Sequence, residues 1–174
     1  MGLKRLFFIL TAMIFFASCN NDAVPLVTTA AVAVCDDENI SLNKEIVRKE
    51  NANIALIAKR YRWNLEQTPT GLFYEILNKK TGNYPQTKDE VQIKGKIYLQ
   101  DGTELYNDKT DGIKAFIVNR SEDPVGLHEL VKLMCEGEKS RAIIPSYLAY
   151  GITGSEETPP LAFWICEIEL IKIN

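Results

Sequence analysis

Residues 133–154, LMCEGEKSRAIIPSYLAYGITG, are the stretch that decides the fold of this chain. They run from the end of a helical pattern to Gly137, and then along a short strand pattern that stops at Pro145. Tyr150 and Gly151 follow at the next turn. A generic strand and turn does not need a proline, a tyrosine and a glycine at these offsets, so the segment predicts a specialised turn next to a strand.

Strand and helix patterns flank this stretch. Val91, Ile93, Ile97 and Leu99 alternate with polar residues, which indicates a half-buried strand. The other expected elements are strands at residues 71–78, 114–119, 140–145 and 162–173 and a short helix at residues 125–135. Many strands with one short internal helix predict an α+β fold, in which an antiparallel sheet curls around that helix.

The N-terminus carries the pattern of an export signal. A basic pair at residues 4–5 precedes an apolar run at residues 6–16, which is shorter than the ~20 residues needed to span a bilayer. Small residues at 17–18 come directly before Cys19, in a pattern that resembles the lipobox of bacterial lipoproteins. We therefore expect residues 1–18 to be a signal peptide and Cys19 to carry a lipid, which would anchor an exported protein to a periplasmic or outer-membrane surface. The alternative is plain secretion with an incidental Cys19.

A tether and a helix are expected between the lipid and the domain. Residues 19–40 are rich in Ala, Thr and Val without a clear period, so we expect a lipid-anchored tether there. An amphipathic helix is expected at residues 41–66, with Ser41 as its N-cap. Its apolar face should pack on the domain or on a second copy of the helix, which would make a dimer through Ser41–Trp63. Residues 67–174 then form the domain itself.

Composition argues against several classes of function. The net charge of −3 and the lack of a basic run argue against nucleic acid as a partner. The cysteines have no zinc-binding spacing, and unpaired burial is favoured over a bridge between Cys135 and Cys166. His128 lies in HELVK rather than HExxH and is expected to be exposed on its helix. No metal site and no cofactor are therefore expected.

The order of motifs resembles the FKBP-type peptidyl-prolyl cis-trans isomerase family over residues 68–173. The motifs are TPTGLFYEIL at residues 68–77, VQIKGKIYLQDGTELY at residues 91–106, the stretch at residues 126–154, and PPLAFWICEIELIKI at residues 159–173. The chain also looks like the FKBP-type lipoproteins linked to gliding motility, which share the EGE at residues 136–138. The resemblance implies rotation about Xaa-Pro bonds of polypeptide clients, achieved by preferential binding of the twisted amide and without a nucleophile.

The resemblance also implies which residues form the site. The implied substrate-binding set is Leu105, Tyr106, Phe116, Leu127, Tyr150 and Pro159. Tyr150 matches the family's catalytic tyrosine, whose hydroxyl fixes the substrate backbone. Leu105, Tyr106 and Leu127 stand where the family has phenylalanine, aspartate and tryptophan, so the pocket departs from the family pattern.

Two further departures fall on strands that alternate inward. Gly95 stands in place of a family tyrosine, and Cys166 in place of a phenylalanine. Aromatic side chains bury about 150–250 Å² each, so their loss is expected to widen or collapse the pocket. Tyr106, Phe163 and Trp164 are the aromatic residues expected to refill the space.

Three functions stay open from the sequence. The first is a membrane-tethered isomerase that assists the folding of exported proteins. The second is a catalytically weak or inactive FKBP-like binding or chaperone module, which the replaced aromatics favour. The third is a component of an envelope or motility complex, docked through the Ser41–Trp63 helix.

Overall fold

The computed structural model describes residues 29–174, with side chains from residue 39 onward. The expected signal peptide, Cys19 and the first part of the tether lie outside the described residues. The chain divides into two compact units, Met1–Asn43 and Lys44–Asn174. The described part of the first unit is helical, and the second unit holds the rest of that helix and all the strands.

The leading helix, α2, spans Thr29–Tyr61. The expected start at Ser41 is therefore wrong, because helix already covers part of the expected tether. An alanine-rich stretch begins at Thr29, and no Gly or Pro interrupts the sequence before Tyr61. The expected end at residue 66 is also too late, since Arg62 adopts a left-handed backbone conformation (φ 57°) that ends the helix.

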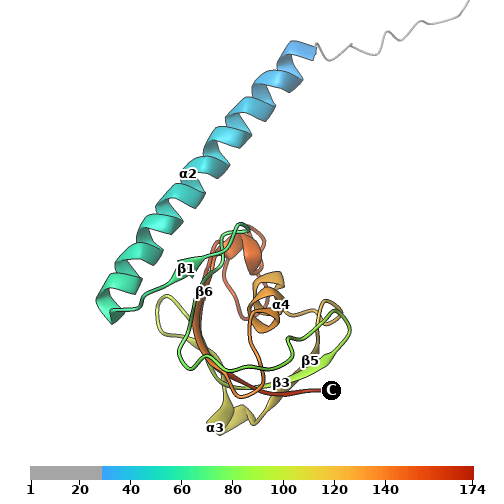
Figure 1. Ribbon diagram of the computed structural model, residues 1–174. Coiled ribbons are helices and arrows are strands. Elements are labelled where there is room, and N and C mark those ends of the chain that lie inside the picture. Colours follow the sequence, from blue (N-terminus) through green and yellow to red (C-terminus); the bar gives the residue numbers. More distant parts are fainter. Residues whose placement is uncertain (1–28) are drawn as a thin grey trace, which may run out of the picture. The chain divides into compact units, whose positions relative to one another are not determined.

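One antiparallel sheet forms the body of the second unit, as the sequence predicted (Figure 1). Its seven strands follow the order β1-β2-β6-β7-β3-β4, and β5 pairs with β3. The strands are β1 Glu66–Gln67, β2 Phe73–Ile76, β3 Glu90–Leu99, β4 Glu104–Asn107, β5 Lys114–Ile117, β6 Lys139–Ile144 and β7 Trp164–Ile173. The short helices are α3 Asp108–Asp111, α4 Val125–Lys132 and a 3-10 turn, η1, at Ser146–Leu148. Figure 1 shows α4 inside the curve of the sheet, which confirms the expected α+β fold.

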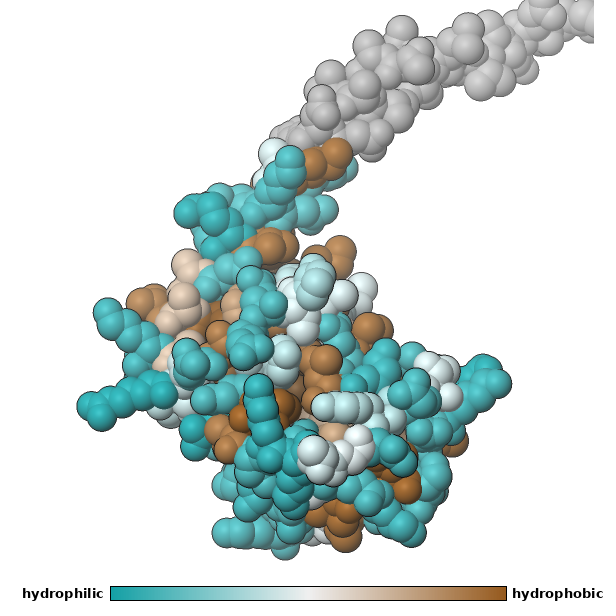
Figure 2. Space-filling view, in the orientation of Figure 1, coloured by the Kyte–Doolittle hydropathy of each residue, from teal (hydrophilic) through white to brown (hydrophobic). Residues whose placement is uncertain are grey.

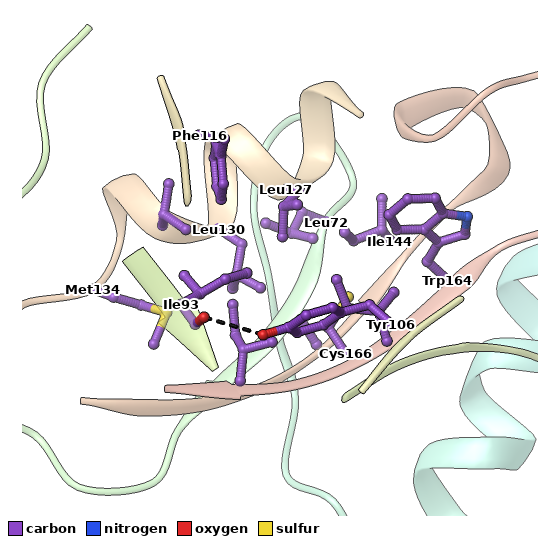
Figure 3. Close-up of a cluster of buried hydrophobic side chains, with 14 of the residues drawn as sticks. Leu72, Ile93, Tyr106, Phe116, Leu127, Leu130, Met134, Ile144, Trp164 and Cys166 are labelled. Carbon is purple, nitrogen blue, oxygen red and sulfur yellow. Dashed lines mark hydrogen bonds between the residues drawn. The ribbon is translucent and has the colours of Figure 1, made fainter. Parts of the chain in front are cut away.

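Strand β7 separates two apolar clusters because its side chains alternate between the faces of the sheet. Trp164 and Cys166 belong to the main core, which also contains Leu127 and Leu130 of α4 (Figure 3). Ile165 points the other way, into a smaller cluster that includes Ile54 of α2. The part of α2 from Lys44 onward therefore packs on the domain, which is the first of the two outcomes expected for its apolar face.

On the face that Figure 2 shows, the surface is mostly hydrophilic, with apolar side chains in separate patches between charged ones. None of the helices in the described part of the chain is both long enough and apolar enough to cross a membrane.

Candidate functional site

A small cavity of about 110 Å³ opens beside the main core. It is lined by Ile97, Leu105, Tyr106, Lys114, Asp123, Tyr150, Ser155, Glu157 and Trp164. The lining comes from strands β3, β4, β5 and β7 and from the loops that hold Asp123 and Tyr150. The cavity therefore has apolar walls with charged residues among them.

The structure brings half of the expected substrate-binding set to this cavity. Leu105, Tyr106 and Tyr150 line it. Phe116 and Leu127 instead lie in the main core, with 4% and 0% of their surfaces exposed. Pro159 is exposed on the loop before β7 and is not one of the lining residues.

Tyr150 is held between a loop and an aromatic wall. Its hydroxyl donates a long hydrogen bond of 3.4 Å to the carbonyl oxygen of Glu122. Its ring meets Trp164 edge-on, with centroids 5.7 Å apart. Burial raises the pKa of the Tyr150 phenol, and the nearby charges of Asp123 and Glu157 raise it further. Tyr150 therefore keeps its proton and can donate a hydrogen bond to a carbonyl oxygen.

Trp164 is the aromatic residue that refills the cavity wall. Its indole N–H donates a 3.2 Å hydrogen bond to Oγ1 of Thr158, which fixes the ring. Phe163 was expected to share this role, but that expectation is wrong, since Phe163 lies in the smaller cluster with Ile54. The alternation along β7 predicts this difference. Trp164 shares a face of the sheet with Cys166, and the adjacent residue Phe163 must point to the other face.

Tyr106 is held against β3 by hydrogen bonds of its hydroxyl. Its Cα pairs with Ile97, while its hydroxyl lies 3.2 Å from the carbonyl oxygen of Ile93 and 2.7 Å from that of Gly112 (Figure 3). The ring therefore runs along β3, from its pairing with Ile97 to the carbonyl of Ile93. Of the two expected outcomes, widening or collapse of the pocket, widening does not occur at Gly95, because Gly95 is absent from the cavity lining and the backbone of Glu167 closely approaches its position.

Both described thiols outside α2 are free and buried. Cys166 is fully buried in the main core, and burial raises its pKa. Cys135 is also buried and unpaired, as the sequence favoured. Cys166 therefore fills core volume behind the cavity and does not line it.

His128 is buried, with 4% of its surface exposed, so the prediction of an exposed helix residue is wrong. Its Nδ1 accepts a 3.2 Å hydrogen bond from the backbone N–H of Asn119, and Nε2 lies 3.3 Å from the carbonyl oxygen of Ser121. The ring also meets Phe116 edge-on. His128 thus fastens the loop between β5 and α4, the loop that carries Asp123 to the cavity.

Charged groups surround the cavity unevenly. Lys114 and Asp123 form an ion pair of 2.8 Å, so each largely neutralises the other. Glu157 also lines the cavity, with no cation among its recorded contacts. The mouth therefore carries a net negative charge. Within residues that the structure describes, no group of three or more His, Cys, Asp or Glu could hold a metal ion.

A larger hollow of about 540 Å³ lies elsewhere, next to β2 and the end of α4. Its walls mix lysines and glutamates, among them Lys79, Lys132 and Glu138. The carboxylate of Glu138 is already occupied by the backbone N–H groups of Lys80 and Cys135. None of the expected site residues reaches this hollow, so the smaller cavity is the candidate site.

Comparison with known proteins places the chain in a family. A sequence model of the FKBP-type peptidyl-prolyl cis-trans isomerases matches residues 82–171, which is more than half of the chain. The FKBP-type peptidyl-prolyl cis-trans isomerase FkpA of Aeromonas hydrophila is 31% identical over 119 residues, 68% of this chain and 44% of that protein. FkpA of Escherichia coli K12 is 30% identical over 110 residues, 63% of this chain and 40% of that protein. The chain thus aligns with less than half the length of these curated relatives.

Solved structures agree on the fold. The crystal structure of FkpA from Escherichia coli has a TM-score of 0.61 at 24% identity, covering 100% of this chain and 84% of that one. A peptidyl-prolyl cis-trans isomerase from Pseudomonas syringae has a TM-score of 0.62 at 23% identity, covering 75% and 95%. From its motifs, its fold and these matches, the chain belongs to the FKBP-type peptidyl-prolyl cis-trans isomerase family.

Proposed function

We propose that this protein catalyses the cis-trans isomerisation of Xaa-Pro bonds in exported polypeptides, with Tyr150 as the catalytic residue. One observation carries the proposal: the Tyr150 hydroxyl, held only by a long hydrogen bond to the carbonyl oxygen of Glu122, lies in a cavity walled by Leu105, Tyr106 and Trp164. The long 3.4 Å bond to Glu122 can be exchanged for a substrate carbonyl at little cost.

The chemistry requires no nucleophile. Amide resonance makes the uncatalysed barrier about 18–20 kcal/mol, and an Xaa-Pro bond turns over in tens to hundreds of seconds. Water stabilises the planar amide by bonding its oxygen, so an apolar wall such as Trp164 and Leu105 favours the twisted form by excluding water. The Tyr150 hydroxyl would hold a neighbouring carbonyl while the bond rotates. This is catalysis by preferential binding of the transition state.

Tyr150→Phe tests the proposal. We expect kcat/KM for a short Xaa-Pro peptide to fall about tenfold, because a hydrogen bond worth about 1.4 kcal/mol in the transition state is lost. The fold should persist, since the phenylalanine ring keeps the edge-on contact with Trp164. Exchange NMR on the full chain in detergent measures the cis-to-trans rate, and unchanged rates in the variant would remove Tyr150 from the mechanism.

A second function is favoured by the size of the cavity. At about 110 Å³ it is smaller than most ligand pockets, which measure about 300–1,000 Å³. A binding or chaperone module without turnover would bind its clients but leave the rate of cis-trans isomerisation at the uncatalysed value. Well-folded full chain that binds an unfolded proline-containing protein, yet does not accelerate exchange in a peptide, would establish this second function.

The charge at the cavity mouth predicts a preference among clients. Glu157 should favour a basic residue before the proline, by up to about fivefold at low salt, since exposed ion pairs contribute about 0.2–1 kcal/mol. Rates for peptides with Lys, Leu or Glu before the proline should differ in that order. Glu157→Gln should reduce the difference, and 0.5 M salt should do the same. Glu156→Gln is the matched control, because its exposed neighbour Glu156 does not line the cavity; equal effects of both variants would contradict the assignment.

We also propose that the protein is a cell-envelope lipoprotein anchored through Cys19, which the pattern at residues 4–19 supports. Expressed as the full chain in a bacterial host, it should lose its leader and gain the mass of several acyl chains. Cys19→Ser should abolish that mass gain, while Cys35→Ser should leave it unchanged. A wild-type protein without an acyl group would point instead to plain secretion.

A further inference from the structure

A carboxylate on the leading helix is buried against the segment that leads to Tyr150. Glu50 of α2 has only 7% of its surface exposed. One of its oxygens accepts the backbone N–H of Ser146 at 2.6 Å, and the other accepts the Ser146 hydroxyl at 3.0 Å. The two residues are 96 positions apart in the sequence, so this contact joins α2 to the start of η1.

Within the described part of the chain, no ion pair neutralises Glu50. Among the ion pairs recorded in the described part of the chain, its helix neighbours Arg48 and Lys49 both pair with Glu45 instead. Burial raises the pKa of the Glu50 carboxyl, which is the physical sign that its charged form is poorly solvated there. A buried carboxylate of this kind is weak support for stability on its own, because an apolar side chain would avoid the desolvation cost.

Ser146 passes the constraint to the turn of the site. While its N–H and hydroxyl are held by Glu50, its carbonyl oxygen accepts the N–H of Ala149 at 3.0 Å and of Gly151 at 2.8 Å. Gly151 takes a left-handed conformation (φ 63°) directly after Tyr150. All three hydrogen-bonding groups of Ser146 are therefore used. Its N–H and hydroxyl bind Glu50 of the helix, and its carbonyl oxygen binds the turn around Tyr150.

We propose that Glu50 is a positioning residue of the isomerase site, acting through Ser146 to set the orientation of the Tyr150–Gly151 turn. The proposal rests on the proposed function, with Tyr150 as the catalytic residue. In this proposal, the leading helix α2 contributes to catalysis through Glu50. Glu50 touches no substrate, so its removal should misplace the Tyr150 hydroxyl while the cavity walls remain.

The effect on rate should lie in kcat. A displacement of about 1 Å at a catalytic group costs up to about a hundredfold, and we expect Glu50→Ala to lower kcat at least tenfold with KM changed less than threefold. Glu50→Gln keeps the length of the side chain. Its amide oxygen can still accept the Ser146 N–H, and its NH2 can donate to the Ser146 hydroxyl oxygen, so the variant should stay within threefold of the wild-type rate. Glu45→Ala, at an exposed ion pair on the same helix, should have no effect.

A second readout reports the geometry directly. Trp164 touches the Tyr150 ring, and Trp63 is the only other tryptophan. In a Trp63→Phe background, the fluorescence of Trp164 should change with Glu50→Ala and not with Glu45→Ala. If the wild type proves inactive, this spectral change still tests the coupling, so failure of the function and failure of the inference stay distinguishable.

The experiment compares these variants in the full chain in detergent, with far-UV circular dichroism to establish folding. If Glu50→Ala does not fold, Glu50→Asp decides the matter: it keeps the charge but is one methylene too short, so it should be impaired while Glu50→Gln is not. Folded Glu50→Ala with wild-type kcat and unchanged Trp164 fluorescence would overturn the inference. Equal activity of the Asp and Gln variants would overturn it too.

Discussion

Gly95→Ala should destabilise the protein by about 3–5 kcal/mol, a large share of the roughly 5–15 kcal/mol that holds a domain together. The backbone at Gly95 has φ 129°, a region that L side chains rarely adopt. A Cβ there would run into the carbonyl oxygen of Glu167 and lie 2.9 Å from Cα of Ile168. Both atoms belong to the backbone of β7, which pairs with β3 at this point and cannot move aside alone.

The matched control is Gly102→Ala. Gly102 also has a positive φ, 91°, but a Cβ there meets nothing within 4 Å. Its replacement by alanine should lower the free energy of unfolding only by the backbone strain, about 1–2 kcal/mol. Urea unfolding of both variants measures the difference, which isolates the clash between β3 and β7. Equal losses at the two positions would show that strain alone makes Gly95 necessary.

The surroundings of Gly95 could be predicted from the sequence only in part. The alternation of Val91, Ile93 and Ile97 correctly predicted the strand and its inward face. It could not show that the Tyr106 hydroxyl would reach the carbonyl oxygen of Ile93, because that depends on the register between β3 and β4.

The same limit applies to the ends of helices and to buried polar groups. Nothing local marks Thr29 as part of a helix except good propensity and the lack of a breaker, so the sequence predicts a start that is too late. His128 is polar on a helix, but its burial follows from a loop that folds over it. The contact of Glu50 with Ser146 spans most of the domain and has no local signature.

The motif around Tyr150 was predictable because it is local. Pro145, Tyr150 and Gly151 are close in sequence, and the hydrogen bonds that shape their turn stay within that segment. Leu105 and Tyr106 also reached the cavity, since they are placed by β4. Phe116 on β5 and Leu127 on α4 lie in the main core instead, because both side chains pack between the sheet and the helix.

The second large effect is expected at Ile54. This residue is fully buried, and it packs with Ile143, Phe163 and Ile165 on the outer face of the sheet. Ile54→Ala should cost about 2–4 kcal/mol, from the lost burial and from a cavity that the rigid sheet cannot close. Unfolding by urea should remain a single transition, because this part of α2 belongs to the same compact unit as the strands.

Leu56→Ala, two positions along the same helix, is the control for this prediction. Leu56 is 66% exposed, so its truncation should change the unfolding free energy by less than about 0.5 kcal/mol. A large difference between the two variants would mean that the helix is held on the sheet by Ile54, which is also the condition for Glu50 to reach Ser146. Equal, small effects would mean that the helix is detached in solution, and the positioning role of Glu50 would fall with it. The stability measurement therefore comes before the kinetic one, since it tests whether the helix is in place to act on Tyr150.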